Sequence, residues 1–321
     1  MILTGILFVL GILALIKGAN WLVDGASSIA GKFGVPPLII GLTIVAFGTS
    51  MPELFVNVLS AISGATDVAF GNVVGSNIAN LLLVLGITAV IAPIAIKKST
   101  TWKEIPFSLL AVLVLFVFAS KPVLDSLGSL TLLRSEGIIL LIFFAIFLYY
   151  AFELARKRDS EQMRVPVMRM KLSRAIVLMI GGLVGLFFGG KFVVDGAVEI
   201  ARLVGLSEYV IAATIVAIGT SLPELVTSIV AARKGNADLA VGNIIGSNIF
   251  NIFWILGITA IISPIPIPAL ARIDLLILLA ATITLFLGIF LNKNERIERW
   301  QGVVFVAGYV AYITYLLTLG R

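Results

Sequence analysis

Two glutamates lie in sequence that is otherwise apolar enough for the interior of a bilayer. Glu53 ends the stretch Gly-Thr-Ser-Met-Pro-Glu at residues 48–53, and Glu224 ends Gly-Thr-Ser-Leu-Pro-Glu at residues 219–224. A carboxylate near the bilayer centre costs at least about 2.5–3.5 kcal/mol on lenient insertion scales, and intramembrane acids are therefore functional by default. Two such acids brought together repel each other unless cations or protons neutralise them. The pair predicts a binding site for cations or protons.

Proline interrupts the helix in both motifs. Pro52 and Pro223 have no N–H, so the carbonyls four residues earlier lose their helical partners. An unbonded carbonyl is costly in hydrocarbon unless it lines a cavity or binds a cation. The same breaks carry four hydroxyl side chains, which belong to Thr49, Ser50, Thr220 and Ser221.

A second motif supplies amides. Residues 71–80 read Gly-Asn-Val-Val-Gly-Ser-Asn-Ile-Ala-Asn, and residues 242–251 read Gly-Asn-Ile-Ile-Gly-Ser-Asn-Ile-Phe-Asn. Positions spaced by four share one helix face, and the small-residue steps at 71/75 and 242/246 allow close backbone approach. Each of these features alone is more often a packing device, but their joint occurrence twice favours an ion site. The two shared faces are formed by Asn72, Ser76 and Asn80, and by Asn243, Ser247 and Asn251.

The chain contains an internal duplication. When residues 11–94 are shifted by 171, they align with residues 182–265 without a gap, and about half of the positions are identical. Both copies keep the acid, the proline and the asparagine-rich motif. A site built by this duplication would contain each ligand type twice.

Composition narrows the class of protein. The chain is 60% hydrophobic and 12% charged, which indicates an integral membrane protein. It has no cysteine and no histidine, which excludes thiol nucleophiles, disulfides, zinc sites of the usual kind and a Ser-His-Asp triad. The available oxygen ligands suit hard cations such as Na⁺ and Ca²⁺. We expect no enzymatic activity, no cofactor, no nucleic-acid partner and no obligatory protein partner.

Hydropathy predicts an all-α membrane protein with ten spans, since a spanning helix needs about 20 apolar residues. One basic linker, residues 153–173, separates a first half (1–152, with its motifs at 46–80) from a second half (174–321, with its motifs at 217–251). The predicted spans are 2–30, 36–62, 69–95, 104–120, 133–154, 174–201, 208–232, 240–264, 271–291 and 299–319.

Charge sets the expected orientation in the cell membrane. Sixteen basic residues fall in the loops on the linker's side of the membrane, and five fall in the loops and C-terminus on the other side. The positive-inside rule therefore places the linker in the cytoplasm and both termini outside. Five spans per copy is an odd number, so the two copies must cross the membrane in opposite orientations. Inverted repeats with interrupted helices are typical of transporters that work by alternating access.

At the two motif pairs the chain resembles the sodium/calcium exchangers of the cation/Ca²⁺ antiporter superfamily, and the resemblance covers essentially the whole chain. It implies ten helices in two inverted halves and Ca²⁺ extrusion driven by Na⁺ entry at overlapping sites. Glu53 and Glu224 would be the main Ca²⁺ ligands, with the backbone carbonyls of Thr49 and Thr220. Na⁺ ligands would be Ser50, Ser76, Ser221, Ser247 and the carbonyls of Ala46 and Ala217, around a centre that contains Asn80 and Asn251. The helices at 2–30 and 174–201 would slide over the remaining core.

Alternatives remain open at this point. Some branches, including K⁺-dependent exchangers, carry Asp at the position of Asn251, so two amides indicate K⁺ independence. Proton-coupled calcium exchangers resemble Gly-Asn-x-x-Glu at the first motif, a form that this chain lacks, although carboxylates can carry protons. A non-transporting membrane scaffold or sensor and an intramembrane hydrolase are alternatives from other classes.

Three other acids have expected structural roles. Asp24 and its repeat equivalent Asp195 are expected at helix ends or interfaces, and Lys191 and Asp195, four residues apart, are expected to form a local ion pair. Asp238 is expected near the N-terminus of its helix, where negative charge is favoured.

Overall fold

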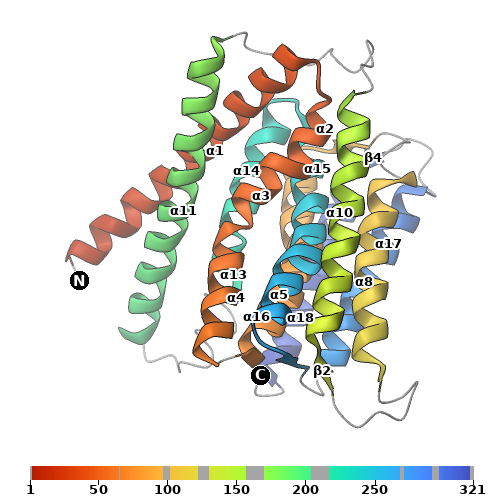
Figure 1. Cartoon of the computed structure of the whole chain (residues 1–321). Coiled ribbons are helices and arrows are strands. Elements are labelled where there is room, and N and C mark those ends of the chain that lie inside the picture. Colours follow the sequence, from red (N-terminus) through yellow and green to blue (C-terminus); the bar gives the residue numbers. More distant parts are fainter. Residues whose placement is uncertain are drawn as a thin grey trace.

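Most of the chain is helical. The computed structural model describes residues 2–64, 66–96, 102–121, 130–156, 170–203, 217–267, 271–290 and 296–318 (Figure 1). Seven of the described helical segments are long and apolar enough to cross a membrane, and an eighth is added if a bent pair counts as one span. The long helices outside the centre are α1 (Ile2–Phe33), α8 (Glu104–Ala119), α10 (Arg134–Arg156), α11 (Leu172–Leu203), α17 (Ala271–Phe290) and α18 (Arg299–Thr318).

The predicted spans coincide with these helices to within a few residues. On either side of the predicted linker 153–173 the helices extend two residues further than the predicted spans, because α10 continues to Arg156 and α11 begins at Leu172. Residues 153–156 are Glu-Leu-Ala-Arg, which are all good helix formers or neutral, so the helix has no local reason to end earlier. Residues 157–169 of the linker and residues 208–216 of the predicted span 208–232 lie outside the described residues.

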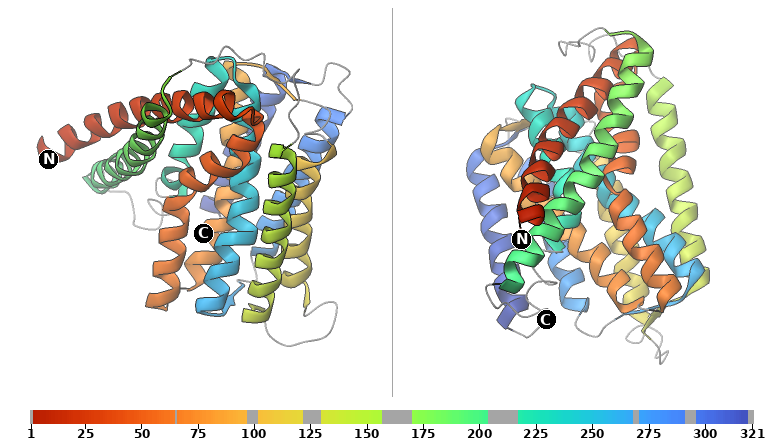
Figure 2. Two further views of the ribbon diagram at one scale, coloured as in Figure 1. Left: turned by 45° about the horizontal axis from the view of Figure 1, so that its top comes forward. Right: turned by 90° about the vertical axis from the view of Figure 1, so that its left-hand side faces the viewer.

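The helices α1 and α11 form a pair that stands apart from the main bundle and is tilted relative to it (Figures 1 and 2). They run antiparallel, because Gly11 faces Gly189 and Gly18 faces Gly182. A Cβ added at Gly18 would lie 2.9 Å from the backbone oxygen of Gly182. Glycine therefore allows the two backbones to touch along the crossing, as in small-residue contacts between membrane helices.

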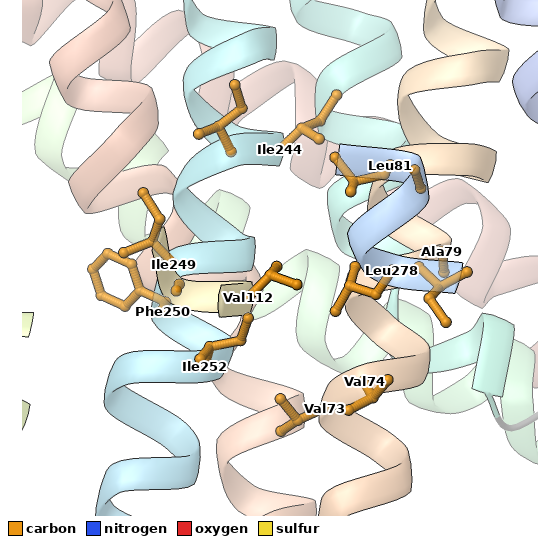
Figure 3. Packing of buried hydrophobic residues seen from close by; sticks show 14 of the residues in the cluster. Val73, Val74, Ala79, Leu81, Val112, Ile244, Ile249, Phe250, Ile252 and Leu278 are labelled. Carbon is orange, nitrogen blue, oxygen red and sulfur yellow. The ribbon is translucent and has the colours of Figure 1, made fainter. Parts of the chain in front are cut away.

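The centre of the bundle is formed by the two helices that carry the asparagine motifs. The first consists of α5 (Thr66–Ile78), η2 (Ala79–Val84) and α6 (Leu85–Ile91), and the second of α15 (Ala237–Ile249), η4 (Phe250–Ile255) and α16 (Leu256–Ile262). These are the most buried of the spanning helices. Figure 3 shows Val73 and Leu81 of the first packed near Ile244 and Ile252 of the second, with Leu278 of α17 beside them.

The π-helical segments η2 and η4 begin at equivalent positions of the two copies, directly before Asn80 and Asn251. A third, η1 (Gly41–Val45), lies between α2 (Pro37–Ile40) and α3 (Ala46–Thr49). A π turn widens the helix and rotates the following side chains relative to a regular α-helix, and such turns are frequent at functional sites.

Glycine brings a second pair of helices close together. A Cβ on Gly242 would lie 2.4 Å from the carbonyl oxygen of Leu38, and one on Gly246 would lie 2.6 Å from that of Leu42. This confirms the close approach predicted from the 242/246 step. For Gly71 and Gly75 no described atom lies within 4 Å of the added Cβ, and the equivalent partner segment, 208–216, is outside the described residues.

Four short strands connect the two halves. β1 (Ile94–Ala95) pairs with β4 (Arg296–Ile297), and β2 (Thr131–Leu132) pairs with β3 (Ile265–Pro266), both antiparallel. Each pair contains one strand from each half of the chain. The halves are thus interleaved rather than packed as two separate bodies.

Candidate cation site

Two broken helices face each other at the candidate site. The first break separates α3 from α4 (Met51–Ser63), which bends away by 45°, and the second separates α13 (Ala217–Thr220) from α14 (Leu222–Arg233). Ser50 and Ser221 interrupt the helices with nearly the same backbone angles, φ −84° and ψ 8° against φ −89° and ψ 5°. The predicted interruption is confirmed, and it lies two residues before each proline. Pro52 and Pro223 occupy the first turn of the next helix, where a missing N–H costs nothing.

Both glutamates lie in the first turn of the helix that follows the break. The positive end of the helix dipole and the free N–H groups favour a carboxylate there. Glu53 is 1% exposed and Glu224 is fully buried, so protein surrounds both carboxylates. They lie close enough for their negative charges to repel each other.

Hydroxyl side chains from both halves hold Glu224. Ser50 donates a hydrogen bond from its Oγ to Glu224 Oε1 at 3.1 Å, and Ser247 donates to the same oxygen at 3.3 Å. On the other side, the hydroxyls of Thr220 and Ser76 are neighbours of the Glu53 carboxylate. The arrangement is crosswise, since each glutamate has a hydroxyl neighbour from the helix break of the other half.

Asn243 connects the two halves behind the carboxylates. Thr49 Oγ1 donates to Asn243 Oδ1 at 3.0 Å, and Asn243 Nδ2 donates to Ser228 Oγ at 3.0 Å and to the backbone oxygen of Glu224 at 3.4 Å. At the first glutamate, Asn57 Nδ2 donates to the backbone oxygen of Glu53 at 2.7 Å. Asn57 and Ser228 occupy equivalent positions but differ in type, and the motif comparison did not select either one.

The two asparagine helices also meet across the halves, where one asparagine of each predicted face contacts an asparagine outside the other face. Asn80 Nδ2 donates to Asn248 Oδ1 at 3.1 Å, and Asn251 Nδ2 donates to Asn77 Oδ1 at 3.5 Å. Asn77 and Asn248 were not predicted as site residues, because they lie off the i, i+4, i+8 face. Their duplication at equivalent positions was a signal that could have identified them.

Several buried oxygens at this place have no hydrogen-bond partner among the described atoms. They are Glu53 Oε2, Glu224 Oε2, Asn80 Oδ1, Asn251 Oδ1, Ser76 Oγ and Ser221 Oγ. Leaving a buried polar atom unsatisfied costs about 1–3 kcal/mol, and more for a charged group, so native proteins rarely do so without a reason. A cation that accepts electron density from these oxygens would remove the cost.

The two predicted alanine carbonyls lie at the start of the short helices before the breaks. The carbonyl of Ala46 accepts from Ser50 N at 3.0 Å and from Thr49 Oγ1 at 3.3 Å. Ala217 is the first residue of α13, and nothing is described of its side-chain surroundings. In the described part of the chain, no group of three or more His, Cys, Asp or Glu side chains gathers as a metal cluster. The site is therefore built from two acids plus neutral oxygens.

The structure describes three acidic side chains outside the site, for which the sequence predicted an ion pair, interfaces or helix ends. Lys191 and Asp195 form the predicted ion pair within α11, with Nζ to Oδ2 at 2.7 Å. Asp24 pairs with Lys234 at 2.7 Å, which connects α1 to the residue after α14. Asp238 lies in the first turn of α15, as predicted.

Apolar spanning helices that enclose two acids and several neutral oxygens define a multi-pass membrane protein with a buried cluster of oxygen atoms. Oxygen is the ligand type that hard cations prefer. The sodium/calcium exchanger protein family matches residues 3–153 and 174–318. The chain belongs to this family, whose members are membrane ion exchangers for Na⁺ and Ca²⁺ rather than enzymes.

Individual relatives match along the full length. The chain is 40% identical over 325 residues to the putative antiporter CaxA of Alkalimonas amylolytica, with 99% of each protein covered. It is 34% identical over 346 residues to the sodium/calcium exchanger MaX1 of Methanosarcina acetivorans, with 97% of each covered. It is also similar to a solved structure of the sodium-calcium exchanger NCX_Mj soaked with zero Na⁺ and Ca²⁺. There the TM-score is 0.83 at 33% identity, and the match covers 98% of this chain and 100% of that one.

Proposed function

We propose that this protein exchanges Na⁺ for Ca²⁺ across the cell membrane by alternating access, without a requirement for K⁺. The observation that carries the proposal is the meeting of Glu53 and Glu224, fully enclosed by protein, with unpartnered oxygens around them. Two buried negative charges match one divalent cation, and the same oxygens can hold monovalent cations in its place. Exchange follows if the two ions compete for these ligands.

The proposed ligands are those that the resemblance to the sodium/calcium exchangers implies. Glu53 and Glu224, with the carbonyls of Thr49 and Thr220, form the Ca²⁺ site. Na⁺ is held by hydroxyls and carbonyls around it, with Asn80 and Asn251 at the centre. Ser50 and Ser247 already contact the carboxylate of Glu224, so an ion there would bind to groups from both halves. The remaining Na⁺ ligands are Ser76, Ser221 and the carbonyls of Ala46 and Ala217.

The proposed architecture is ten helices in two inverted halves, 1–152 and 174–321. Support comes from α1 and α11, which are equivalent helices of the two copies and run antiparallel. The strand pairs and hydrogen bonds that cross between the halves support the same arrangement, because each such contact occurs twice, with the two halves exchanging roles. An inverted repeat has two related packings, one open to each side of the membrane.

Orientation is part of the proposal. The distribution of sixteen against five basic residues favours external termini and a cytoplasmic linker at 153–173. The pair of α1 and α11, which stands apart from the bundle, is the part proposed to slide over the core (Figure 2).

The test is uptake of ⁴⁵Ca²⁺ into proteoliposomes that contain the purified protein. We expect uptake when Na⁺ is loaded inside and diluted outside, with or without K⁺. Uptake that ignores a Na⁺ gradient and follows a pH gradient would assign the chain to proton coupling, and a strict need for K⁺ would overturn the interpretation of Asn251. Absence of uptake under all gradients would favour a scaffold or sensor.

A further inference from the structure

Two asparagines behind the proposed site make contacts that the ligand assignment does not use. Asn77 and Asn248 are 0% and 1% exposed, and the amide oxygen of each already accepts a hydrogen bond from the other half. Asn248 Oδ1 accepts from Asn80 Nδ2 at 3.1 Å, and Asn77 Oδ1 accepts from Asn251 Nδ2 at 3.5 Å. The amide nitrogens of Asn77 and Asn248 have no partner among the described atoms. Among the described atoms, each of these two side chains therefore makes one hydrogen bond, which it accepts from a central asparagine, Asn80 or Asn251.

The direction of these bonds matters because an amide has two different ends. Rotation of an asparagine amide by 180° exchanges a carbonyl oxygen for an NH₂ group of nearly the same shape. Only the oxygen can bind a cation, whereas the NH₂ group carries positive partial charge toward it. When a partner accepts a hydrogen bond from Nδ2, it holds the amide so that Oδ1 points away from that partner. In this structure Asn80 Oδ1 and Asn251 Oδ1 are the buried atoms left without a partner.

Each central asparagine follows, by four residues, a serine that is a neighbour of a glutamate carboxylate. Asn251 follows Ser247 by one helical turn, and Ser247 bonds Glu224 at 3.3 Å. Asn80 follows Ser76 by one turn, and Ser76 is a neighbour of Glu53. Both central amides thus lie on the motif face that carries the hydroxyl next to a glutamate.

We propose that Asn77 and Asn248 are positioning residues that fix the orientation of the central amides, so that Asn80 and Asn251 present oxygen rather than NH₂ to the transported cation. This inference rests on the proposed function. The pairing is crosswise: Asn248 of the second half orients Asn80 of the first, and Asn77 of the first half orients Asn251 of the second. The 3.1 Å bond is the stronger of the two, because a contact of 3.5 Å lies at the weak limit of hydrogen bonding.

Single substitutions test the acceptor role. Asn248→Leu keeps the side-chain size and removes the acceptor, and we expect the Ca²⁺ concentration for half-maximal ⁴⁵Ca²⁺ uptake to rise about 10-fold, as for other residues that orient metal ligands. Asn77→Leu should give a smaller rise, in line with its longer bond. Asn248→Asp keeps an acceptor oxygen whether or not it is protonated, and should restore most of the affinity that Asn248→Leu loses. Asn20→Leu on α1 is the matched control, because among the described residues the Asn20 side chain bonds to Ile16 of its own helix.

Double variants test the crosswise pairing. If Asn248 acts through Asn80, then Asn248→Leu should cause little further loss of Ca²⁺ affinity in a protein that already carries Asn80→Ala. Combined with Asn251→Ala, it should lower the affinity by the product of the two single-variant losses. Asn77→Leu should behave in the opposite way. A residue with a merely structural role would lower the amount of folded protein without this pairwise selectivity. Where flux is too low to measure, ⁴⁵Ca²⁺ binding to the purified protein in detergent gives the same comparison.

The outcomes separate the inference from the function on which it rests. Wild-type protein without ion-driven Ca²⁺ uptake would overturn the proposed function. Wild-type uptake with equal losses in Asn248→Leu and Asn248→Asp, or with losses that multiply in every pair, would overturn the positioning role alone. Loss of affinity in the leucine variant, rescue by aspartate and selective coupling of the crosswise pairs would establish it.

Discussion

Glu53 and Glu224 carry the proposed exchange at the scale of single residues. Each lies at the start of a helix, next to the charge of the other and next to hydroxyls from the opposite half. Removing one negative charge while keeping the side-chain size should leave too little charge to replace the hydration shell of Ca²⁺. We expect Glu53→Gln and Glu224→Gln each to lower Na⁺-driven ⁴⁵Ca²⁺ uptake at least about 100-fold, since each single loss removes half of the fixed charge.

The control for these variants is Glu153→Gln. The Glu153 side chain is 43% exposed near the end of α10, and its contact to Arg156 in the described part of the chain is long, at 3.8 Å, so its neutralisation should leave uptake unchanged. Near-normal exchange in either Glu53→Gln or Glu224→Gln, with protein that still inserts, would remove that glutamate from the site.

The residues of the site were predictable to the extent that chemistry and duplication marked them together. Glu53 and Glu224 stand out because acids are rare in apolar spans. Ser50 and Ser221 stand out because they lie two residues before the prolines, which are also rare there. Asn248 was not predicted, because an asparagine off the motif face is indistinguishable by type from a packing residue. The positioning role proposed for Asn248 rests on its contact with Asn80 on another helix, and that contact depends on how the two halves dock.

At the scale of elements, α1 and its equivalent α11 differ in the polar contacts that their equivalent aspartates make. Asp24 on α1 pairs with Lys234 just after α14, and Ser27 accepts a hydrogen bond from Asn236 at 2.9 Å. In the other half the residue equivalent to Lys234 is Ser63, and Asp195 pairs with Lys191 on its own helix instead. The ion pair of Asp24 therefore connects the proposed sliding helices to the core, whereas the ion pair of Asp195 lies within α11.

Breaking this tie should shift the balance between the two packings. Partly exposed ion pairs contribute about 0.2–1 kcal/mol, which corresponds to about a 1.4- to 5-fold change in an equilibrium. We expect Asp24→Asn to change the rate of Na⁺-driven ⁴⁵Ca²⁺ uptake within that range. Asp195→Asn should leave it unchanged, because its partner lies on the same helix. Reversal of both charges, Asp24→Lys with Lys234→Asp, should return the rate toward that of the wild type, and equal effects of Asp24→Asn and Asp195→Asn would contradict the assignment.

At the scale of the whole molecule, hydropathy predicted most helices, since a long apolar run has few alternatives to a spanning helix. The π segments at Ala79 and Phe250 carry no composition signal of their own, and strands of two residues are too short for an alternating pattern. Both features depend on contacts between the halves. The duplication predicted that such contacts exist, but it did not say which residues make them.

The inverted topology has its own test. Ile62 and Arg233 are equivalent positions at the ends of α4 and α14, and both side chains are exposed. Because the chain has no native cysteine, Ile62→Cys and Arg233→Cys can be labelled individually with an impermeant thiol reagent. We expect labelling at 62 in intact cells and at 233 only after permeabilisation, as the charge distribution requires. Labelling of both from the same side would mean a parallel repeat.

The central claim is that the two halves build one shared ion site rather than two separate ones, and equilibrium binding of ⁴⁵Ca²⁺ to purified protein tests it most directly. Because both carboxylates lie in one enclosed cluster, we predict one Ca²⁺ per chain, displaced by Na⁺ and lost in Glu53→Gln and in Glu224→Gln alike. Two Ca²⁺ per chain, with each single variant retaining one, would contradict the shared site.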